Sequence, residues 1–226
     1  MNYAEFKNIL EIREENLYRD VYLENQDAIR IKKEATAVKN FEKIFNSVFE
    51  ITYEKGFQAM TMRDLSCHTK LSLGALYGYF SGKEELLAII HKQGNSMIRK
   101  IFGQFYDPQA NPVEQLRTLI KAHMFLSESA RPWFYFTFME ARNLTPTGRE
   151  AVLSMEEYTE NMLLEILEAG ETEGIFIKRD HVMTASLIKA MQQDWYLKRW
   201  KYKKRGITVD TYTEYLIDFT ISFISL

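Results

Sequence analysis

Proline placement is the sequence feature that most constrains the fold of this chain. Only four prolines occur in 226 residues, and three of them, Pro112, Pro132 and Pro146, stand where an amphipathic segment begins. Proline is favoured in the first turn of a helix, because the N–H that it lacks would have no partner there. Apolar residues then recur three and four residues apart, and no alternating pattern predicts a pair of strands. We therefore predict an all-α fold.

The composition is that of an ordinary globular chain. Hydrophobic residues make up 46% and charged residues 27% of the sequence, which argues against disorder. The net charge is −2, so a contact with nucleic acid would need a local positive face. Cys67 is the only cysteine and no apolar run is long enough to cross a bilayer, so we expect a cytoplasmic protein without membrane contact. The histidines are scattered, and we expect neither a metal nor a cofactor.

The helical segments change in length along the chain. A charged helical extension is predicted over residues 1–35, a module of short helices over 36–92 and a bundle of long helices over 93–226. In the bundle, Asp180 is positioned to cap a helix running to about Lys201. Thr208 or Asp210 is positioned to cap the last helix. The chain is therefore predicted to have a small N-terminal module and a larger C-terminal domain.

Two short helices on a tight turn are predicted inside the module. Gly56 is expected to end the preceding helix as a left-handed cap. Thr61 can cap a helix ending near Thr69, and only Lys70 and Leu71 separate that helix from a second N-cap residue, Ser72. This spacing is typical of a helix-turn-helix, whose second helix enters the major groove of DNA.

The stretch Phe41–Ile90 resembles the N-terminal signature of the TetR (tetracycline-repressor-like) family. The family usually has Gly where Lys70 stands and Ala where Ser66 stands, so we expect Lys70 to adopt a left-handed conformation. The resemblance implies a homodimeric, ligand-responsive transcriptional repressor that binds a palindromic operator. In it, residues 36–92 would bind DNA and 93–226 would bind the ligand and form the dimer. The residues that carry it are those of GFQAMTMRDLSCHTKLSLGALYGYFSGKEELL: Gly56, Thr61, Leu65, Ser72, Leu76, Tyr77, Tyr79, Phe80 and Lys83–Leu87.

The resemblance also implies which residues contact DNA. Hydroxyls and one ammonium would bind phosphates, while the recognition helix would present mainly small or apolar groups to the bases. Contact with thymine methyls and shape readout are then the expected sources of specificity. The phosphate contacts would be Thr61, Ser72, Tyr77, Tyr79 and Lys83, and the reading face would be Leu73, Gly74, Ala75 and Gly78, with Arg63 from the preceding helix.

Aromatic residues after Pro132 suggest a wall of an apolar ligand site between helices, although core packing is the plainer interpretation. The effector would be small and apolar or amphipathic. The segment Glu140–Leu144 and the aromatic and basic end of the following long helices resemble TetR regulators that respond to fatty acyl-coenzyme A. The basic run Lys198–Arg205 is interpreted as a solvated loop or, alternatively, as a phosphate-binding patch. Glu140 and Arg142 are the polar candidates for orienting such a ligand. The candidate ligand-binding residues are Met124, Phe125, Trp133, Phe136, Glu140 and Trp195.

The last two helices carry apolar faces that would pack internally or against a twin chain. The candidate dimer residues are Leu187, Met191, Leu216, Phe219 and Phe223. No enzyme motif is present, since the GYFSGKE segment lacks both the glycine spacing and the Ser or Thr of a phosphate-binding loop. The alternative function is a helical adaptor that uses its helix-turn-helix to contact protein.

The N-terminal extension has several interpretations. It is a solvated helical cap, it docks on the module, it extends the dimer, or it brings Arg30, Lys32 and Lys33 to a minor groove. Its helix is predicted from Tyr3 to about Lys33.

Overall fold

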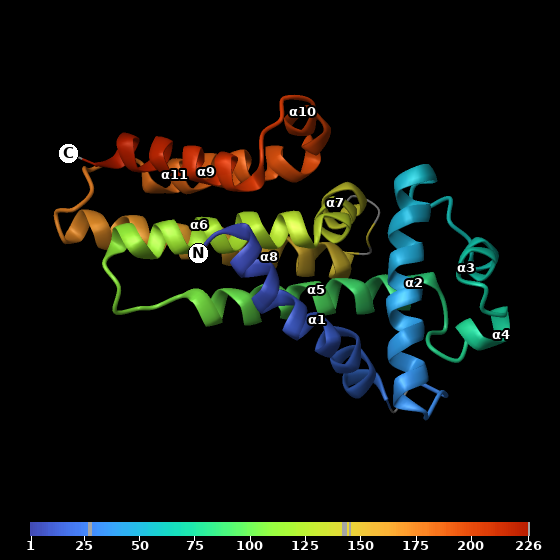
Figure 1. The fold of residues 1–226 in the computed structure, drawn as a ribbon. Coiled ribbons are helices and arrows are strands. Elements are labelled where there is room, and N and C mark those ends of the chain that lie inside the picture. The colour runs from blue at the N-terminus through green and yellow to red at the C-terminus, as the bar shows by residue number, and fades with distance from the viewer. Residues whose placement is uncertain (27–28, 142–143, 145, 226) are drawn as a thin grey trace. The chain divides into compact units, whose positions relative to one another are not determined.

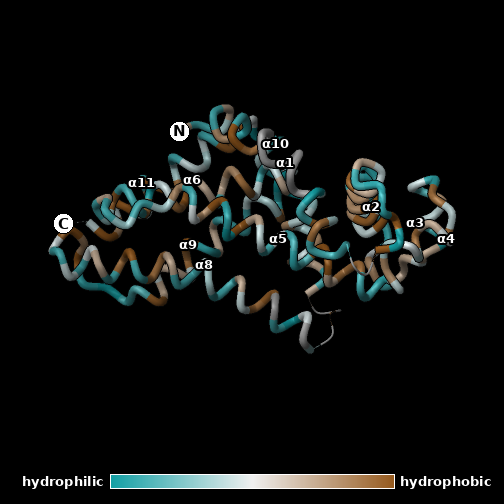
Figure 2. Tube along the Cα trace, turned by 90° about the horizontal axis from the view of Figure 1, so that it is seen from below, coloured by the Kyte–Doolittle hydropathy of each residue, from teal (hydrophilic) through white to brown (hydrophobic). Residues whose placement is uncertain are grey.

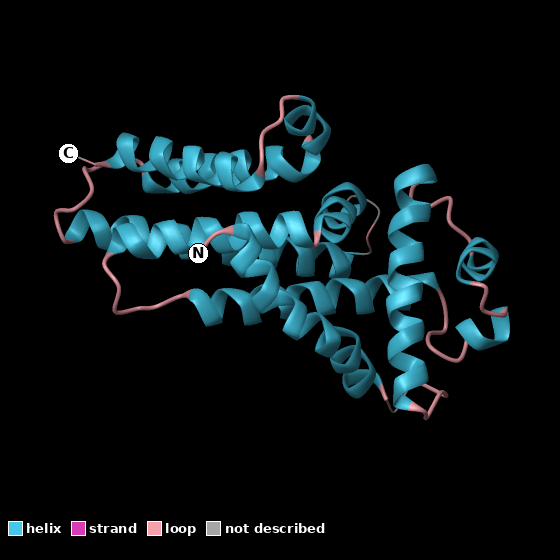
Figure 3. Ribbon diagram, viewed as in Figure 1, coloured by secondary structure: helices cyan, strands magenta, loops and turns pink. Residues whose placement is uncertain are grey.

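The computed structural model describes residues 1–26, 29–141, 144 and 146–225, with side chains for all of these except 11–17, 147 and 151. The described residues form α-helices and no sheet, which confirms the all-α prediction (Figure 1, Figure 3). None of the described helices is long and apolar enough to span a membrane. The helices are α1 (Tyr3–Asn25), α2 (Glu34–Lys55), α3 (Met62–Thr69), α4 (Leu73–Leu76), α5 (Lys83–Phe105), α6 (Pro112–Ser129), α7 (Arg131–Glu140), α8 (Pro146–Thr172), α9 (His181–Leu197), α10 (Arg199–Lys204) and α11 (Val209–Ile224).

Helix starts follow local capping signals. Pro112 and Pro146 are the first residues of α6 and α8, as predicted. Asp180 Oδ1 accepts a hydrogen bond from the backbone of Met183 at 2.9 Å, and Thr208 Oγ1 caps α11 in the same way at 3.1 Å. These contacts satisfy N–H groups that have no partner within the helix.

Two predicted helix ends were wrong. The helix capped by Asp180 ends at Leu197, and most of the basic run expected in a loop forms the separate helix α10. The N-terminal helix ends at Asn25 rather than near Lys33. Beyond these ends the chain contacts residues that are distant in the sequence: Arg199 bonds Glu128, and the Arg30 N–H donates to the carbonyl of Gly78.

Contacts divide the chain into two compact units. The head unit comprises Asn8–Met97 and Pro132–Val152, and the bundle unit comprises Met1–Lys7, Ile98–Arg131 and Leu153–Leu226. The segment that carries α7 therefore groups with the helix-turn-helix, although it follows residue 92 in the chain.

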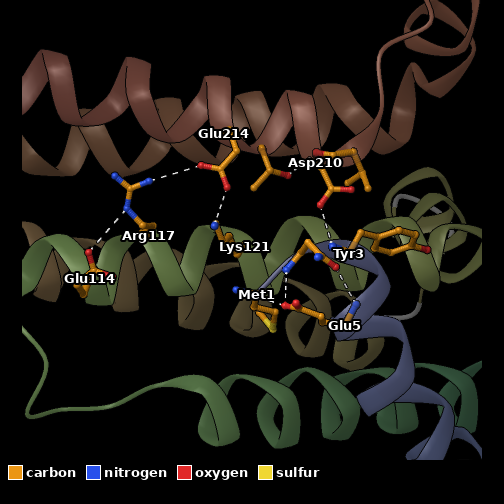
Figure 4. A network of polar contacts seen from close by, with 11 residues as sticks. Met1, Tyr3, Glu5, Glu114, Arg117, Lys121, Asp210 and Glu214 are labelled. Carbon is orange, nitrogen blue, oxygen red and sulfur yellow. Dashed lines mark hydrogen bonds and ion pairs between the residues drawn. The ribbon is translucent and has the colours of Figure 1, made fainter.

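In the bundle unit, α6 packs against α9 and α11. The ring of Phe6 lies 5.7 Å from that of Phe125, deep in the apolar core. Polar contacts cover the edge of this core: Lys121 Nζ lies 2.6 Å from Glu214, and the Tyr3 N–H donates to Asp210 Oδ1 at 2.8 Å (Figure 4). The first residues of the chain are therefore an integral part of this unit.

In the head unit, α2 supplies the central apolar face. Ala37, Phe41, Ile44 and Val48 are fully buried, and their spacing of three and four residues places them along one side of the helix. Figure 2 shows the corresponding apolar stretches along α2. The short helix α3 packs against α2, and α4 packs against α3.

Candidate nucleic-acid interface

A reciprocal capping box begins α3. Thr61 Oγ1 accepts from the Asp64 N–H at 3.1 Å, and the Asp64 carboxylate accepts from the Thr61 N–H at 2.7 Å and from its hydroxyl at 2.6 Å. Lys55 Nζ lies 2.8 Å from the same carboxylate. Hydrogen bonds from Lys55 and Thr61 hold the pKa of Asp64 well below its usual value. The exposed Thr61 hydroxyl can therefore meet a phosphate only by giving up its bond to Asp64.

The turn between α3 and α4 contains a left-handed lysine. Lys70 has φ 59° and ψ 22°, and it is the only non-glycine residue with positive φ in the part of the chain that the structure describes. Ser66 Oγ donates to the carbonyl of Leu71 at 2.6 Å, and Thr69 Oγ1 accepts from the Leu71 N–H at 3.2 Å. A left-handed residue other than glycine costs roughly 1–2 kcal/mol, and these hydroxyl contacts offset part of that cost.

Gly56 differs from the expected left-handed cap. Its φ is 82° but its ψ is 151°, which lies outside the left-handed helical region and is accessible almost only to glycine. Its N–H still donates to the carbonyl of Thr52 at 2.8 Å, so it ends α2 with an extended exit. The prediction that glycine ends α2 here is confirmed, but the predicted left-handed helical conformation is wrong.

The recognition helix α4 is short and its outer side is open. Ser72 Oγ accepts from the Ala75 N–H at 3.1 Å and caps the helix. Gly74 is exposed and has no neighbour within 4 Å of the place where a Cβ would stand. Tyr77 is 47% exposed. Leu73 is half-buried, as is Ala75, while Arg63 on α3 is exposed.

Two residues that were assigned to the DNA surface lie beneath it. Tyr79 is 2% exposed, its hydroxyl accepts from Asn40 Nδ2 at 2.7 Å, and its ring packs edge-on against Phe41. Burial raises the pKa of Tyr79. Gly78 is also buried, and a Cβ there would stand 2.8 Å from Ile31 Cδ1. Tyr79 therefore holds the recognition helix on α2 instead of presenting a hydroxyl to phosphate.

Lys83 at the start of α5 already has a protein partner. Its ammonium donates to the carbonyl of Gln58 at 3.0 Å and lies 5.5 Å from the centre of the Phe57 ring. The side chain therefore ties α5 to the loop before α3.

Three of the candidate ligand residues lie in the head unit and join α7 to α2 and α5. Trp133 Nε1 donates to the carbonyl of Ile90 at 3.2 Å, and a Cβ at Gly94 would lie 1.9 Å from its ring. Phe136 packs against Phe49, Phe57 and the buried ring of His91. The Glu140 carboxylate accepts from the Phe57 N–H at 3.2 Å. Arg142 and Asn143 lie outside the described residues.

The other three, Met124, Phe125 and Trp195, are fully buried in the bundle unit. Trp195 Nε1 donates to Glu128 at 3.0 Å, and the indole stacks on Tyr202 of α10. Arg199 lies over the same indole and bonds Glu128 at 3.1 Å. Part of the basic run therefore packs on Trp195, while Lys203, Lys204 and Arg205 are exposed.

A buried polar cluster in the bundle unit was missed by the sequence analysis. Lys189 is 4% exposed, and its ammonium donates to Thr159 Oγ1 at 2.6 Å. It lies 3.4 Å from both the Glu156 carboxylate and His123 Nε2. The buried amide oxygen of Gln192 has no partner among the described residues. Position 189 follows Ile188 and is four residues after Ala185, a spacing that could have indicated a lysine on the buried face of α9.

The candidate dimer residues divide by exposure. Leu187 on α9 and both Phe219 and Phe223 on α11 are exposed, and Met191 is half-buried. Leu216 is 3% exposed and belongs to the core of its own unit. The exposed apolar surface of α9 and α11 therefore includes Leu187, Phe219 and Phe223 but not Leu216.

Comparisons with known proteins match both parts of the chain. The family described as tetracyclin repressor-like, C-terminal domain, matches residues 109–223, and the one described as bacterial regulatory proteins, tetR family, matches residues 48–90. The HTH-type transcriptional regulator HbdR of Aromatoleum sp. is 20% identical over 163 residues, covering 72% of this chain and 71% of that protein.

Solved structures share the fold. The ketosteroid transcriptional regulator KstR2 of Mycobacterium tuberculosis superposes with a TM-score of 0.74 at 19% identity, covering 88% of this chain and 99% of that one. The structure of AibR in complex with isovaleryl coenzyme A and operator DNA gives a TM-score of 0.68 at 19% identity, covering 82% of this chain and 98% of that one.

Proposed function

Because the chain belongs to the TetR family of helix-turn-helix transcriptional repressors, and is therefore not an enzyme, we propose that it binds a palindromic operator as a homodimer and releases it when a small effector binds. The observation that carries this proposal is the open outer side of α4, where Gly74 is unobstructed and Tyr77 projects beside it. Small groups at this position allow close approach to base edges. Specificity then comes from thymine methyl contacts and DNA shape more than from hydrogen bonds.

Selection of the wild-type protein against a random double-stranded DNA pool, at two salt concentrations, tests the proposal. We expect enrichment of a palindrome whose affinity falls steeply as salt rises. Arg63→Ala is expected to weaken binding to it, whereas Lys204→Ala, which removes an exposed cation from α10, leaves it unchanged. If no duplex is enriched at either salt concentration, the adaptor function replaces this one.

The dimer would form through the exposed apolar side chains of α9 and α11, Leu187, Phe219 and Phe223. Exposed apolar groups clustered on adjacent helices are typical of interaction sites, and a two-fold axis would match a palindrome. Phe219→Asp is expected to shift the mass measured by light scattering from dimer to monomer. A wild-type monomer at micromolar concentration would contradict the proposal.

The effector would bind within residues 93–226, as a small apolar or amphipathic molecule. An acyl-coenzyme A is supported by AibR, a structural relative solved with isovaleryl coenzyme A. The buried ammonium of Lys189 among apolar helices would suit a polar head group. Release would follow from a shift between states that differ in the spacing of the two recognition helices, about 34–36 Å for adjacent major grooves.

Isovaleryl and stearoyl coenzyme A at saturation test the effector class. A ligand present at 100 times its Kd stabilises the folded state by about 2.7 kcal/mol, so we expect a rise in Tm and a loss of DNA affinity. Free coenzyme A is the control. An unchanged Tm together with unchanged DNA affinity would exclude this class of effector.

A further inference from the structure

The segment between α1 and α2 is docked against the turn that follows the recognition helix. The Arg30 N–H donates to the carbonyl of Gly78 at 2.8 Å, and Ile29 is buried beside it. Ile31 lies so close to Gly78 that no larger residue fits there without displacement. In Figure 1 this segment lies next to the turn after α4. The backbone of Arg30 is therefore fixed at the end of the helix that reads DNA.

The side chain of Arg30, in contrast, is exposed, and no described residue pairs with its guanidinium. Two other cations of the extension are used internally, whereas Lys33 is exposed. Arg19 Nε lies 2.7 Å from Glu34, and Lys32 Nζ donates to the carbonyls of Gln26 at 3.1 Å and Ile29 at 3.0 Å. The tethered segment thus presents one arginine whose charge has no internal role.

The surroundings of Arg30 favour an anionic partner. Gly78 directly follows Tyr77, the exposed tyrosine next to the recognition helix, so the backbone of Arg30 is bound one residue away from that side chain. Two acidic groups at the starts of α3 and α5 are engaged, Asp64 with Lys55 and Glu85 with the backbone and hydroxyl of Ser81, whereas Glu84 is exposed. Because the backbone of Arg30 is already fixed, binding through its side chain orders no further backbone.

We propose that Arg30 contacts a phosphate of the DNA backbone that borders the major groove entered by α4. This inference rests on the proposed function. Elements that flank a recognition helix cross the sugar-phosphate backbone, and a guanidinium binds phosphate oxygens in a bidentate manner. The N-terminal extension is then a part of the DNA-binding surface, and a dimer adds two phosphate contacts that the helix-turn-helix alone lacks.

Fluorescence anisotropy at several salt concentrations tests the contact. The wild type, Arg30→Ala, Arg30→Lys and Arg19→Ala are titrated onto the duplex obtained by selection and onto a scrambled duplex. We expect Arg30→Ala to weaken binding to both duplexes at least tenfold, because a phosphate contact carries no sequence information. The plot of log affinity against log salt should become less steep by about 2 for the dimer, because each lost phosphate contact reduces the magnitude of the slope by about 0.9. Arg30→Lys keeps the charge and should keep the slope.

The control and the contrary outcomes separate this inference from the proposed function. Arg19→Ala removes a cation of the same extension that is already paired, and it should bind as the wild type does. Arg30→Ala with wild-type affinity at every salt concentration overturns the assignment alone, provided that circular dichroism shows the same fold. Loss of preference at particular base pairs, without a change of slope, also overturns it, because the arginine would then read a groove. A wild type that binds neither duplex overturns the inference and the proposed function together.

Discussion

The helix-turn-helix and the helical bundle are held together over different sequence distances. In the head unit, Thr61, Ser66, Thr69 and Ser72 each bond a backbone or side-chain group no more than five residues away. In the bundle unit, the backbone of Tyr3 bonds Asp210, 207 residues further along the chain. The caps and the tight turn of the helix-turn-helix are therefore encoded locally, whereas the bundle unit depends on packing between distant segments.

The largest effect should come from breaking the long-range packing. Phe125→Ala removes a fully buried ring that contacts Tyr3 and Phe6. A Phe→Ala change in a core costs about 3–5 kcal/mol, and we expect a loss of that size in the free energy of unfolding measured in urea. Phe138→Ala, at an exposed position of α7, should cost under about 0.5 kcal/mol. Equal losses for the two variants would contradict the packing described here.

A pH effect of nearly the same size should come from His91, which joins α5 to α7. Burial lowers the pKa of His91 to about 4, and neither ring nitrogen has a partner among the described residues. The unfolded chain therefore binds a proton between pH 6.5 and 4 that the folded chain does not, so stability falls as the pH falls through this window. The expected loss is about 3 kcal/mol. His91→Leu should remove that part of the slope in urea unfolding at pH 7, 5.5 and 4.5, and an unchanged slope would mean that His91 is hydrated.

A smaller effect should follow from removing a local cap. Thr61→Ala deletes both hydroxyl contacts of the α3 capping box, and we expect a loss of about 1 kcal/mol. Thr61→Ser keeps them and should retain most of the stability. Hydrogen exchange should show the loss as faster exchange at the start of α3, with the bundle unaffected. A uniform increase across the chain would mean that the module is not locally encoded.

The smallest effect should be a gain. Lys70→Gly places glycine at the left-handed position of the turn, where it avoids the steric cost of a Cβ. We expect stabilisation of under about 1 kcal/mol, reduced by the greater freedom of glycine in the unfolded chain. Ser66→Ala in the same background should lower Tm, because it removes the bond to Leu71. If Lys70→Gly destabilises the chain, the lysine side chain makes a contact whose stabilising free energy exceeds the steric cost of its left-handed conformation.

The features that could be predicted from the sequence are those that need few neighbours. Asp180 and Thr208 cap their helices as predicted, because an N-cap bonds a backbone group within three residues. The burial of Gly78 and Tyr79 could not be read locally, since it depends on Ile31 and Asn40.

The same reason explains what was missed in the bundle. Lys189 is buried where Thr159 and Glu156 of another helix lie against it, and the ring of Tyr202 in α10 stacks on Trp195 of α9. Such pairings follow from the topology of the whole chain. A pattern within one helix does not contain them.

The packing of Trp133 against Gly94 also affects the intrinsic fluorescence of the protein. The three tryptophans occupy different surroundings: Trp133 is enclosed in the head unit, Trp195 is enclosed in the bundle unit, and Trp200 is 69% exposed. Indole emission shifts to longer wavelength as its surroundings become more polar, so each residue reports on one place. In a chain that keeps Trp133 alone, any loosening of α7 from Gly94 would appear as a red shift, and the head unit could be followed without an added dye.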